Sequence, residues 1–345
     1  MFSAVAMSCK TKLLLLCFLI SGSTWAAEID KAAVSVITPN GQHLRAFVTT
    51  PRGTASPVGG IFLVGWLSCD SVEYKDGETD GFGALLLRLV ARSGRLMFRM
   101  EKPGINGSEG VCKDTDFNTE LADYRAAFTT FLANPRLDKQ RVFVLGLSNG
   151  AAIAPLVAQA TPIRGYVVSG GWTKTWFEHM LETERKSMTW RHVPPAAVTW
   201  RIKLVSQFYS EYLLKRKLPG DVIRENPALA EIWKDEPAHQ YGRPAAFYHQ
   251  LQALNIAEVW QSASAPVLAI HGEYDVLMSA EDHASLASWA NQKKAGNGTF
   301  LEIPHMSHLL EIYNTRDDML KDANGHFDDS LVTKILGWMS RVEAR

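Results

Sequence analysis

Short apolar runs recur along the chain, each bounded by glycine, proline or polar residues, and they predict buried strands. The first two runs are joined by Asn40-Gly41, a dipeptide typical of a hairpin turn. Elsewhere, apolar residues recur at helical spacing and predict amphipathic helices over residues 81–92, 119–132 (capped near Asn118) and 327–342. The predicted strands are, in order, 33–39, 43–51, 58–65, 95–100, 142–145, 163–169, 266–271 and 298–303.

Residues 171–262 differ from this pattern and predict a helical insertion, or cap, between two strands. The segment is helical in periodicity, is interrupted by Pro194-Pro195, Pro219-Gly220 and Pro244, and is rich in tryptophan. For most of these aromatic side chains we expect a packing role, although together they also indicate an apolar or aromatic-lined substrate site. The tryptophans concerned are Trp172, Trp176, Trp190, Trp200, Trp233 and Trp260.

The N-terminus has the pattern of a secretory signal peptide over residues 1–26. Lys10 and Lys12 precede a short apolar run, and small residues end at Ala26, the expected cleavage site. The apolar run is too short to span a bilayer, so we expect no stable membrane insertion. The sequence therefore predicts an exported protein, periplasmic or secreted.

Composition limits the classes of partner. The chain of 345 residues carries 36 Lys+Arg and 36 Asp+Glu, which leaves no basic excess for nucleic acid. Its length suits one large α/β domain, residues 27–170 and 263–345, with the cap inserted. We expect a small-molecule substrate and no nucleic-acid partner, and the oligomeric state stays open.

Two of the four cysteines, Cys69 and Cys112, would remain after the signal peptide is removed. An even pair in an exported protein indicates a disulfide. The alternative is two buried free thiols.

Residues 141–150, R-V-F-V-L-G-L-S-N-G, combine a predicted strand, a G-x-S-x-G turn and the start of a helix. This order is typical of a nucleophile elbow, in which a sharp turn lifts the hydroxyl of Ser148 above the sheet. The alternative is a glycine-rich turn with an incidental serine, but the flanking strand and helix favour the elbow. The pattern resembles the α/β-hydrolase superfamily, in its exported, capped branch of esterases and serine-aminopeptidase-like enzymes.

The resemblance implies two partners for Ser148. The superfamily carries its acid in a turn after a late strand, which here is Gly272-Glu273-Tyr274-Asp275 and points to Asp275, with Glu273 as the weaker alternative. Its histidine follows the last strand, which points to His308, with His305 interpreted as structural. The order Ser148, Asp275, His308 matches the superfamily. No carboxylate or cysteine cluster supports a metal at the two histidines, and we expect no cofactor.

The resemblance also implies an oxyanion hole from two backbone N–H groups, those of Asn149 and Trp66. Many members have histidine where this chain has Val64, so we expect Cys69 to brace the loop through a disulfide to Cys112. Residues 101–110 resemble the glycine loop that follows the superfamily's fourth strand and has a structural role there.

The implied fold is an α/β-hydrolase fold, a mostly parallel eight-stranded sheet flanked by helices, with an inserted helical cap. The implied activity is hydrolysis of a carboxylic ester of an apolar or aromatic small molecule through an acyl-enzyme. A peptidase or amidase on the same scaffold is the first alternative, and a binding protein with a vestigial site is the second.

Overall fold

The computed structural model describes residues 29–345 apart from 54–56, 75–76, 80 and 160. The predicted signal peptide lies outside the described residues.

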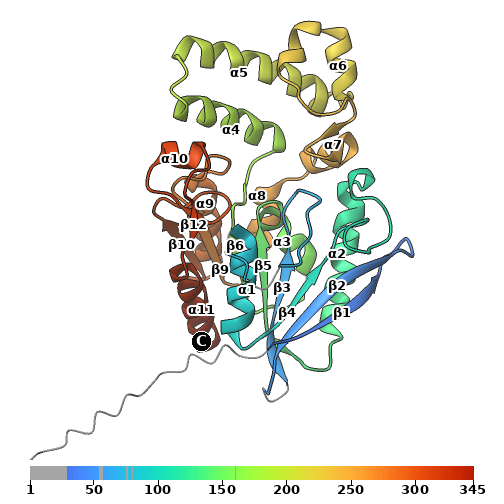
Figure 1. Cartoon of the computed structure of the whole chain (residues 1–345), viewed down its shortest axis with the longest axis vertical. Coiled ribbons are helices and arrows are strands. Elements are labelled where there is room, and N and C mark those ends of the chain that lie inside the picture. The colour runs from blue at the N-terminus through green and yellow to red at the C-terminus, as the bar shows by residue number, and fades with distance from the viewer. Residues whose placement is uncertain (1–28, 54–56, 75–76, 80, 160) are drawn as a thin grey trace, which may run out of the picture.

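One large sheet forms the centre of the molecule (Figure 1). Its strand order is β1-β2-β4-β3-β5-β6-β9-β10. The pairs β1–β2 and β2–β4 are antiparallel and the remaining pairs are parallel, which confirms the predicted mostly parallel eight-stranded sheet. The strands are β1 Ile29–Ile37, β2 His43–Pro51, β3 Val58–Val64, β4 Leu96–Met100, β5 Leu137–Leu147, β6 Gly165–Ser169, β9 Val267–Gly272 and β10 Gly298–Ile303.

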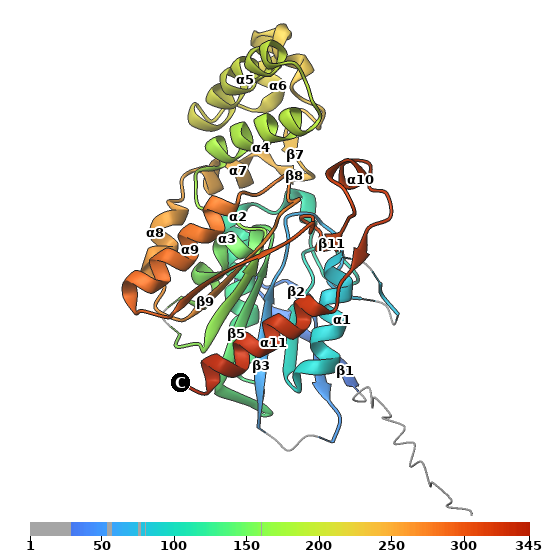
Figure 2. The same cartoon turned by 90° about the vertical axis from the view of Figure 1, so that its left-hand side faces the viewer.

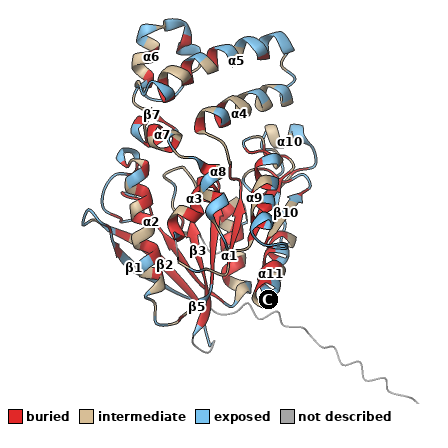
Figure 3. Ribbon diagram, turned by 180° about the vertical axis from the view of Figure 1, so that it is seen from behind, coloured by how far each residue is buried: buried red, intermediate tan, exposed pale blue. Residues whose placement is uncertain are grey.

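The central strands are apolar throughout because both faces of the sheet are covered. In β3, Phe62 packs on one face with α2, α3, α8 and α9, whereas Ile61 packs on the other face with α1 and α11. Figure 3 shows the resulting band of buried residues along the strands. The flanking helices are α1 Gly81–Ser93, α2 Phe117–Leu132, α3 Asn149–Ala158, α8 Ile256–Ser262, α9 Ala280–Lys293 and α11 Ser330–Glu343.

The start of α2 differs from the prediction of a cap near Asn118. The cap is Asp116, whose carboxylate accepts a hydrogen bond from the backbone N–H of Thr119 at 2.8 Å. The helix begins earlier because Phe117, only 1% exposed, is drawn into the core as its first residue. A carboxylate at this position accepts a hydrogen bond from a free N–H of the first turn. Its negative charge also interacts favourably with the positive end of the helix dipole.

Between β6 and β9 the chain forms a group of helices, most of which lie beyond one end of the sheet (Figures 1 and 2). Helix α4 contacts the loop after β9, where the hydroxyl of Thr183 donates a hydrogen bond to the carbonyl of Leu277. Helix α8 instead lies beside α3, where the indole N–H of Trp260 donates to the carbonyl of Ala152. The elements are α4 Trp176–Trp190, α5 Pro195–Tyr209, η2 Ser210–Leu214, α6 Pro219–Glu225, η3 Pro227–Glu231, β7 His239–Gln240, β8 Arg243–Pro244 and α7 Ala245–Gln252.

The remaining elements are short: η1 Cys112–Asp114, β11 Glu311–Ile312, α10 Arg316–Leu320 and β12 His326–Phe327. Across the described part of the chain, no helix combines the length and apolarity needed to cross a membrane.

Candidate active site

Ser148 occupies the turn between β5 and α3. Its backbone has φ 54° and ψ −120°, an unfavourable conformation for a residue with a side chain, and its N–H is held by the carbonyl of Ser169 at 2.9 Å. Strain of this kind persists only where the surroundings impose it, and it is frequent at reactive residues. The predicted strand–turn–helix therefore forms, with the serine at its apex.

The two glycines of the turn are required by close backbone contacts. A Cβ on Gly150 would lie 1.9 Å from the carbonyl oxygen of Val64, at the end of β3. A Cβ on Gly146 would lie 2.7 Å from the carbonyl oxygen of Gly150. Only glycine lets the start of α3 approach the ends of β3 and β5 this closely. The first turn of α3, with its free N–H groups, is thereby brought beside the loop that follows β3.

His308 and Asp275 lie in line with this serine. The His308 Nε2 is 3.0 Å from the Ser148 Oγ, and its Nδ1 is 2.9 Å from the Asp275 Oδ2. Asp275 comes from the turn after β9, and His308 from the loop after β10. The structure thus brings together the three residues that the sequence predicts as a triad, from three separate loops at one edge of the sheet.

The carboxylate of Asp275 is buried, and both of its oxygens accept hydrogen bonds. Its second oxygen, Oδ1, accepts the backbone N–H groups of Leu277 and Met278, each at 2.9 Å. Burial by itself would raise the pKa of Asp275, but the charge and hydrogen bond of His308, together with the Met278 N–H and the charge of His271, lower this pKa to about 2. Asp275 therefore stays ionised at neutral pH and can hold the imidazole in one orientation.

Glu273 and His305 lie away from this chain of hydrogen bonds. The Glu273 carboxylate accepts the backbone N–H of His305 at 2.9 Å, which closes the loop after β10. The exposed His305 ring stacks on Tyr274, with the ring centroids 4.9 Å apart. Neither side chain is placed to act as the partner of Ser148.

Trp66 and Asn149, the predicted oxyanion donors, line one cavity together with Ser148. Asn149 is the first residue of α3, so its N–H has no acceptor within the helix. Trp66 lies in the loop after β3 and its indole stacks on Phe82, with the centroids 5.1 Å apart. This loop is held from beneath by Tyr124, whose hydroxyl accepts the backbone N–H of Gly65 at 3.1 Å.

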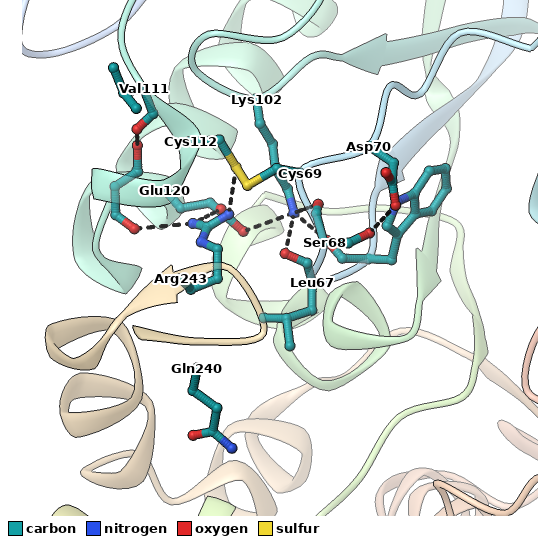
Figure 4. Close-up of a disulfide and its surroundings, with 12 residues drawn as sticks. Leu67, Ser68, Cys69, Asp70, Lys102, Val111, Cys112, Glu120, Gln240 and Arg243 are labelled. Carbon is teal, nitrogen blue, oxygen red and sulfur yellow. Dashed lines mark hydrogen bonds and ion pairs between the residues drawn. A yellow bond between two sulfur atoms is a disulfide. The ribbon is translucent and has the colours of Figure 1, made fainter. Parts of the chain in front are cut away.

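Lys102 is a residue of the site that the sequence interpretation missed. It lies in the glycine loop, two residues after the end of β4, and donates hydrogen bonds to backbone carbonyls of the loop after β3 (Figure 4). Burial lowers its pKa to about 8, against the opposing effect of the Glu120 charge. A lysine two residues after the end of a buried strand is the sequence signal that pointed to it.

Cys69 and Cys112 form a disulfide, as predicted (Figure 4). It joins the loop after β3 to the short helix η1, two segments that are 43 residues apart in the sequence. The guanidinium of Arg243, from β8, lies against it with Nη1 3.2 Å from the Cys112 Sγ. The bridge therefore lies beside the predicted oxyanion loop.

Residues 77–312 match the sequence model of the family described as serine aminopeptidase, S33. The chain belongs to this family. Its members are α/β hydrolases, so the protein is a hydrolase. No curated protein sequence matches the chain significantly.

Solved structures of α/β hydrolases share the fold of this family member. Est1E from Butyrivibrio proteoclasticus, with ferulic acid bound, matches with a TM-score of 0.57 at 14% identity, over 91% of this chain and 100% of that chain. The α/β hydrolase GrgF from Penicillium sp. sh18 gives 0.56 at 14% identity, over 92% and 100%. The Pyrococcus furiosus esterase Pf2001 gives 0.53 at 12% identity, over 91% of both chains. At such identities these matches establish the fold.

The cavity over Ser148 in this S33 family member has a volume of about 450 Å³. The loop after β6 and helix α4 supply Trp172, Trp176 and Met180 to its wall, and the loop after β9 supplies Leu277 and Met278. Trp172 and Trp176 are therefore the two tryptophans of the inserted segment that line the site, a distinction that the sequence left open.

His179, on α4, also lines the cavity and is only 4% exposed. Its ring stacks on Trp172, with the centroids 5.2 Å apart. Burial lowers the pKa of His179 to about 4, so the ring is neutral at neutral pH. His179 therefore adds no positive charge to the cavity wall, which is mostly aromatic and apolar.

Within the part of the chain that the structure describes, no group of three or more His, Cys, Asp or Glu side chains is arranged to hold a metal ion. His305 and His308 in particular point to different partners, Tyr274 and Asp275.

Proposed function

We propose that this hydrolase cleaves carboxylic esters through an acyl-enzyme on Ser148. The observation that carries the proposal is the continuous chain from the Ser148 Oγ through His308 to Asp275, which opens on a largely apolar cavity. This is the arrangement that activates a serine hydroxyl, which is a weak nucleophile by itself.

In the first step, His308 takes the proton of Ser148 as its Oγ attacks the ester carbonyl carbon. Asp275 stabilises the resulting imidazolium through the hydrogen bond at Nδ1. His308 then returns the proton to the leaving alcohol, and the acyl group stays on Ser148. Water activated by the same imidazole releases the acid and restores the hydroxyl.

The negative oxygen of the tetrahedral intermediate would be bound by the backbone N–H groups of Asn149 and Trp66. Their place beside Ser148 in one cavity supports this role, as does the positive end of the α3 dipole. Donors of this kind act without side-chain reorganisation because the backbone is already held in place.

For the substrate we propose an ester of an apolar or aromatic small molecule. Trp66, Phe82, Trp172 and Trp176 present flat apolar surfaces to the cavity. That Est1E, a fold relative, holds ferulic acid supports an aromatic group, although at 14% identity it does not identify the ester. The volume of about 450 Å³ suits a small molecule and not a long peptide.

An aminopeptidase is the second candidate, favoured by the description of the family and by Asp70. An aminopeptidase needs an anion to bind the substrate's ammonium group, and Asp70 is the carboxylate among the residues that line the cavity. Asp70 is exposed and accepts a hydrogen bond from Ser68. If it bound an ammonium group, Asp70→Asn would raise KM for aminoacyl arylamides and leave simple esters unaffected.

The deciding experiment is a substrate screen on the purified protein with p-nitrophenyl esters and aminoacyl arylamides, in parallel for Ser148→Ala and Asp70→Asn. We expect ester turnover that disappears in Ser148→Ala and persists in Asp70→Asn. If arylamides were turned over faster than esters, the peptidase would replace the esterase as the proposed function. A wild-type protein that neither turns over esters nor reacts with a fluorophosphonate probe would instead be a binding protein.

We further propose that the protein is exported and that residues 171–262 act as a cap over the site. The disulfide supports export because such bonds persist in oxidising compartments. The contribution of α4 to the cavity wall supports the cap. An N-terminal sequence that begins at Ala27 in protein taken from the periplasm or medium would establish export, and full-length protein in the cytoplasm would contradict it.

A further inference from the structure

Lys102 is a buried cation with an unusual set of acceptors. Its side chain is 4% exposed, and its Nζ donates to the carbonyl oxygens of Leu67 at 2.9 Å, of Ser68 at 2.7 Å, and of Trp66 (Figure 4). An ammonium group has three protons, and here each has a backbone acceptor. All three acceptors belong to consecutive residues of the loop after β3.

Lys102 belongs to a small buried network of two cations and one carboxylate. Its Nζ is 3.9 Å from Glu120, a residue of α2, and Glu120 also binds Arg243 from β8. Arg243 in turn donates to the carbonyl of Thr115 at 3.2 Å. Burying such charges adds little net stability compared with apolar packing of the same volume. The network is therefore better explained by its effect on the geometry of the loop after β3.

The hydrogen bonds of Lys102 restrict one particular peptide group. The N–H of Trp66 belongs to the peptide that joins it to Gly65. On one side of that peptide the Gly65 N–H is bonded to Tyr124, and on the other side the Trp66 carbonyl is bonded to Lys102. Because peptide groups are planar, anchoring both neighbours fixes the two Cα atoms that flank this peptide, and its N–H keeps only the rotation about the line that joins them.

We infer that Lys102 is a positioning residue for the oxyanion hole and that it holds the backbone N–H of Trp66 toward the carbonyl oxygen of a substrate bound at Ser148. The inference rests on the proposed function. Lys102, in the loop after β4, would support the loop that carries Trp66, a role that the side chain of Val64 cannot take. Through Glu120 and Arg243, the same network joins this loop to the inserted segment.

The test compares Lys102→Met with Arg95→Met. Arg95 is a suitable control because it is also a largely buried cation, at the opposite end of β4, where its Nη2 pairs with Glu343 at 2.7 Å. Each change removes one of the two cations that contact a carboxylate, since Glu120 keeps Arg243 and Glu343 keeps Arg141, so both should lower the melting temperature. Only Lys102→Met alters the loop that carries Trp66.

We expect Lys102→Met to lower kcat for a p-nitrophenyl ester roughly 100-fold, as loss of one oxyanion donor does, while KM changes less than about threefold. Affinity for a trifluoromethyl ketone, to which Ser148 adds to form an oxyanion, should fall with kcat. Arg95→Met should keep kcat and ketone affinity within about threefold of wild type at temperatures where it is folded.

A second variant covers the case in which Lys102→Met does not fold. The triple change of Lys102, Glu120 and Arg243 to Met removes the whole network and leaves none of its charges unpaired. It should fold and show the same loss of kcat. If neither variant loses more kcat than Arg95→Met does, the inference is overturned and the proposed function stands. Absence of Ser148-dependent turnover in the wild type would instead overturn the proposed function.

Discussion

Gly170 lies directly against the imidazole of His308. A Cβ on Gly170 would lie 2.7 Å from the Cε1 of His308, and the Gly170 backbone has φ +71°. The residue after β6 therefore determines how closely the histidine loop can approach Ser148. Any side chain at this position would displace the ring from its hydrogen bonds to Ser148 and Asp275.

For Gly170→Ala we therefore expect a fall in kcat of about 10- to 100-fold, because the imidazole must move. The control is Gly242→Ala, since Gly242 has the same φ of +71° but open space around its Cβ position. Both changes should cost about 1 kcal/mol of stability through backbone strain. Ester kinetics and melting curves measure the two effects, and equal kcat values for both variants would contradict the prediction.

The two histidines of the last loop are expected to behave differently. His308→Gln should lower kcat by orders of magnitude because it removes the base in contact with Ser148. His305→Gln should change kcat little, since the exposed His305 ring contacts Tyr274 and not Ser148. Steady-state kinetics on a p-nitrophenyl ester test both, and the reverse order would assign the base to His305.

Loss of the disulfide should affect both stability and activity. The bridge closes a loop of 43 residues, which stabilises by about 4 kcal/mol in the chain-entropy model. It also joins the loop of Trp66 to η1, so Cys69→Ser with Cys112→Ser should lower the melting temperature and kcat together. Calorimetry and kinetics of the unreduced and reduced wild type provide the comparison. Unchanged kcat after full reduction would limit the bridge to a stabilising role.

The buried carboxyl of Asp123 predicts a pH dependence of stability. Asp123, on α2, is 1% exposed, and within the described residues its two carboxylate oxygens have no hydrogen-bond partner. Burial, with a contribution from the charge of Glu120, raises its pKa from 3.8 to about 7. The folded state then binds more protons than the unfolded state between these two values, so stability falls as the pH rises through this window.

Asp123→Asn should remove this dependence. We expect the variant to be more stable than the wild type at pH 8, by about 2 to 4 kcal/mol, and to differ little from it near pH 4. Asp317→Asn, on the exposed surface of α10, is the control and should follow the wild type. Melting temperatures are measured for the three proteins between pH 4 and 8. If the melting temperature of Asp123→Asn changed with pH as that of the wild type does, the assignment would be contradicted.

Much of the fold was predictable because it depends on local patterns. The apolar runs located the eight strands of the sheet, although β1 begins four residues and β5 five residues earlier than predicted, and the strand–turn–helix around Ser148 followed from G-x-S-x-G and its flanks. The disulfide was predictable because two cysteines remain after the expected cleavage. The roles of Ser148, Asp275 and His308 stay predictions, although the structure brings the three side chains within hydrogen-bonding distance.

Other features were decided only by the tertiary structure, because they depend on contacts between segments far apart in the sequence. Phe117 lies next to Asn118, but its burial against the core moved the start of α2 to Phe117 and the cap to Asp116. Trp172 and Trp176 line the cavity, and the other tryptophans of the inserted segment do not, because the loop after β6 and the start of α4 border the cavity. Lys102 acquires its acceptors from a loop more than thirty residues earlier in the chain. Periodicity and local motifs report which face of an element is buried, but not which distant partner lies there.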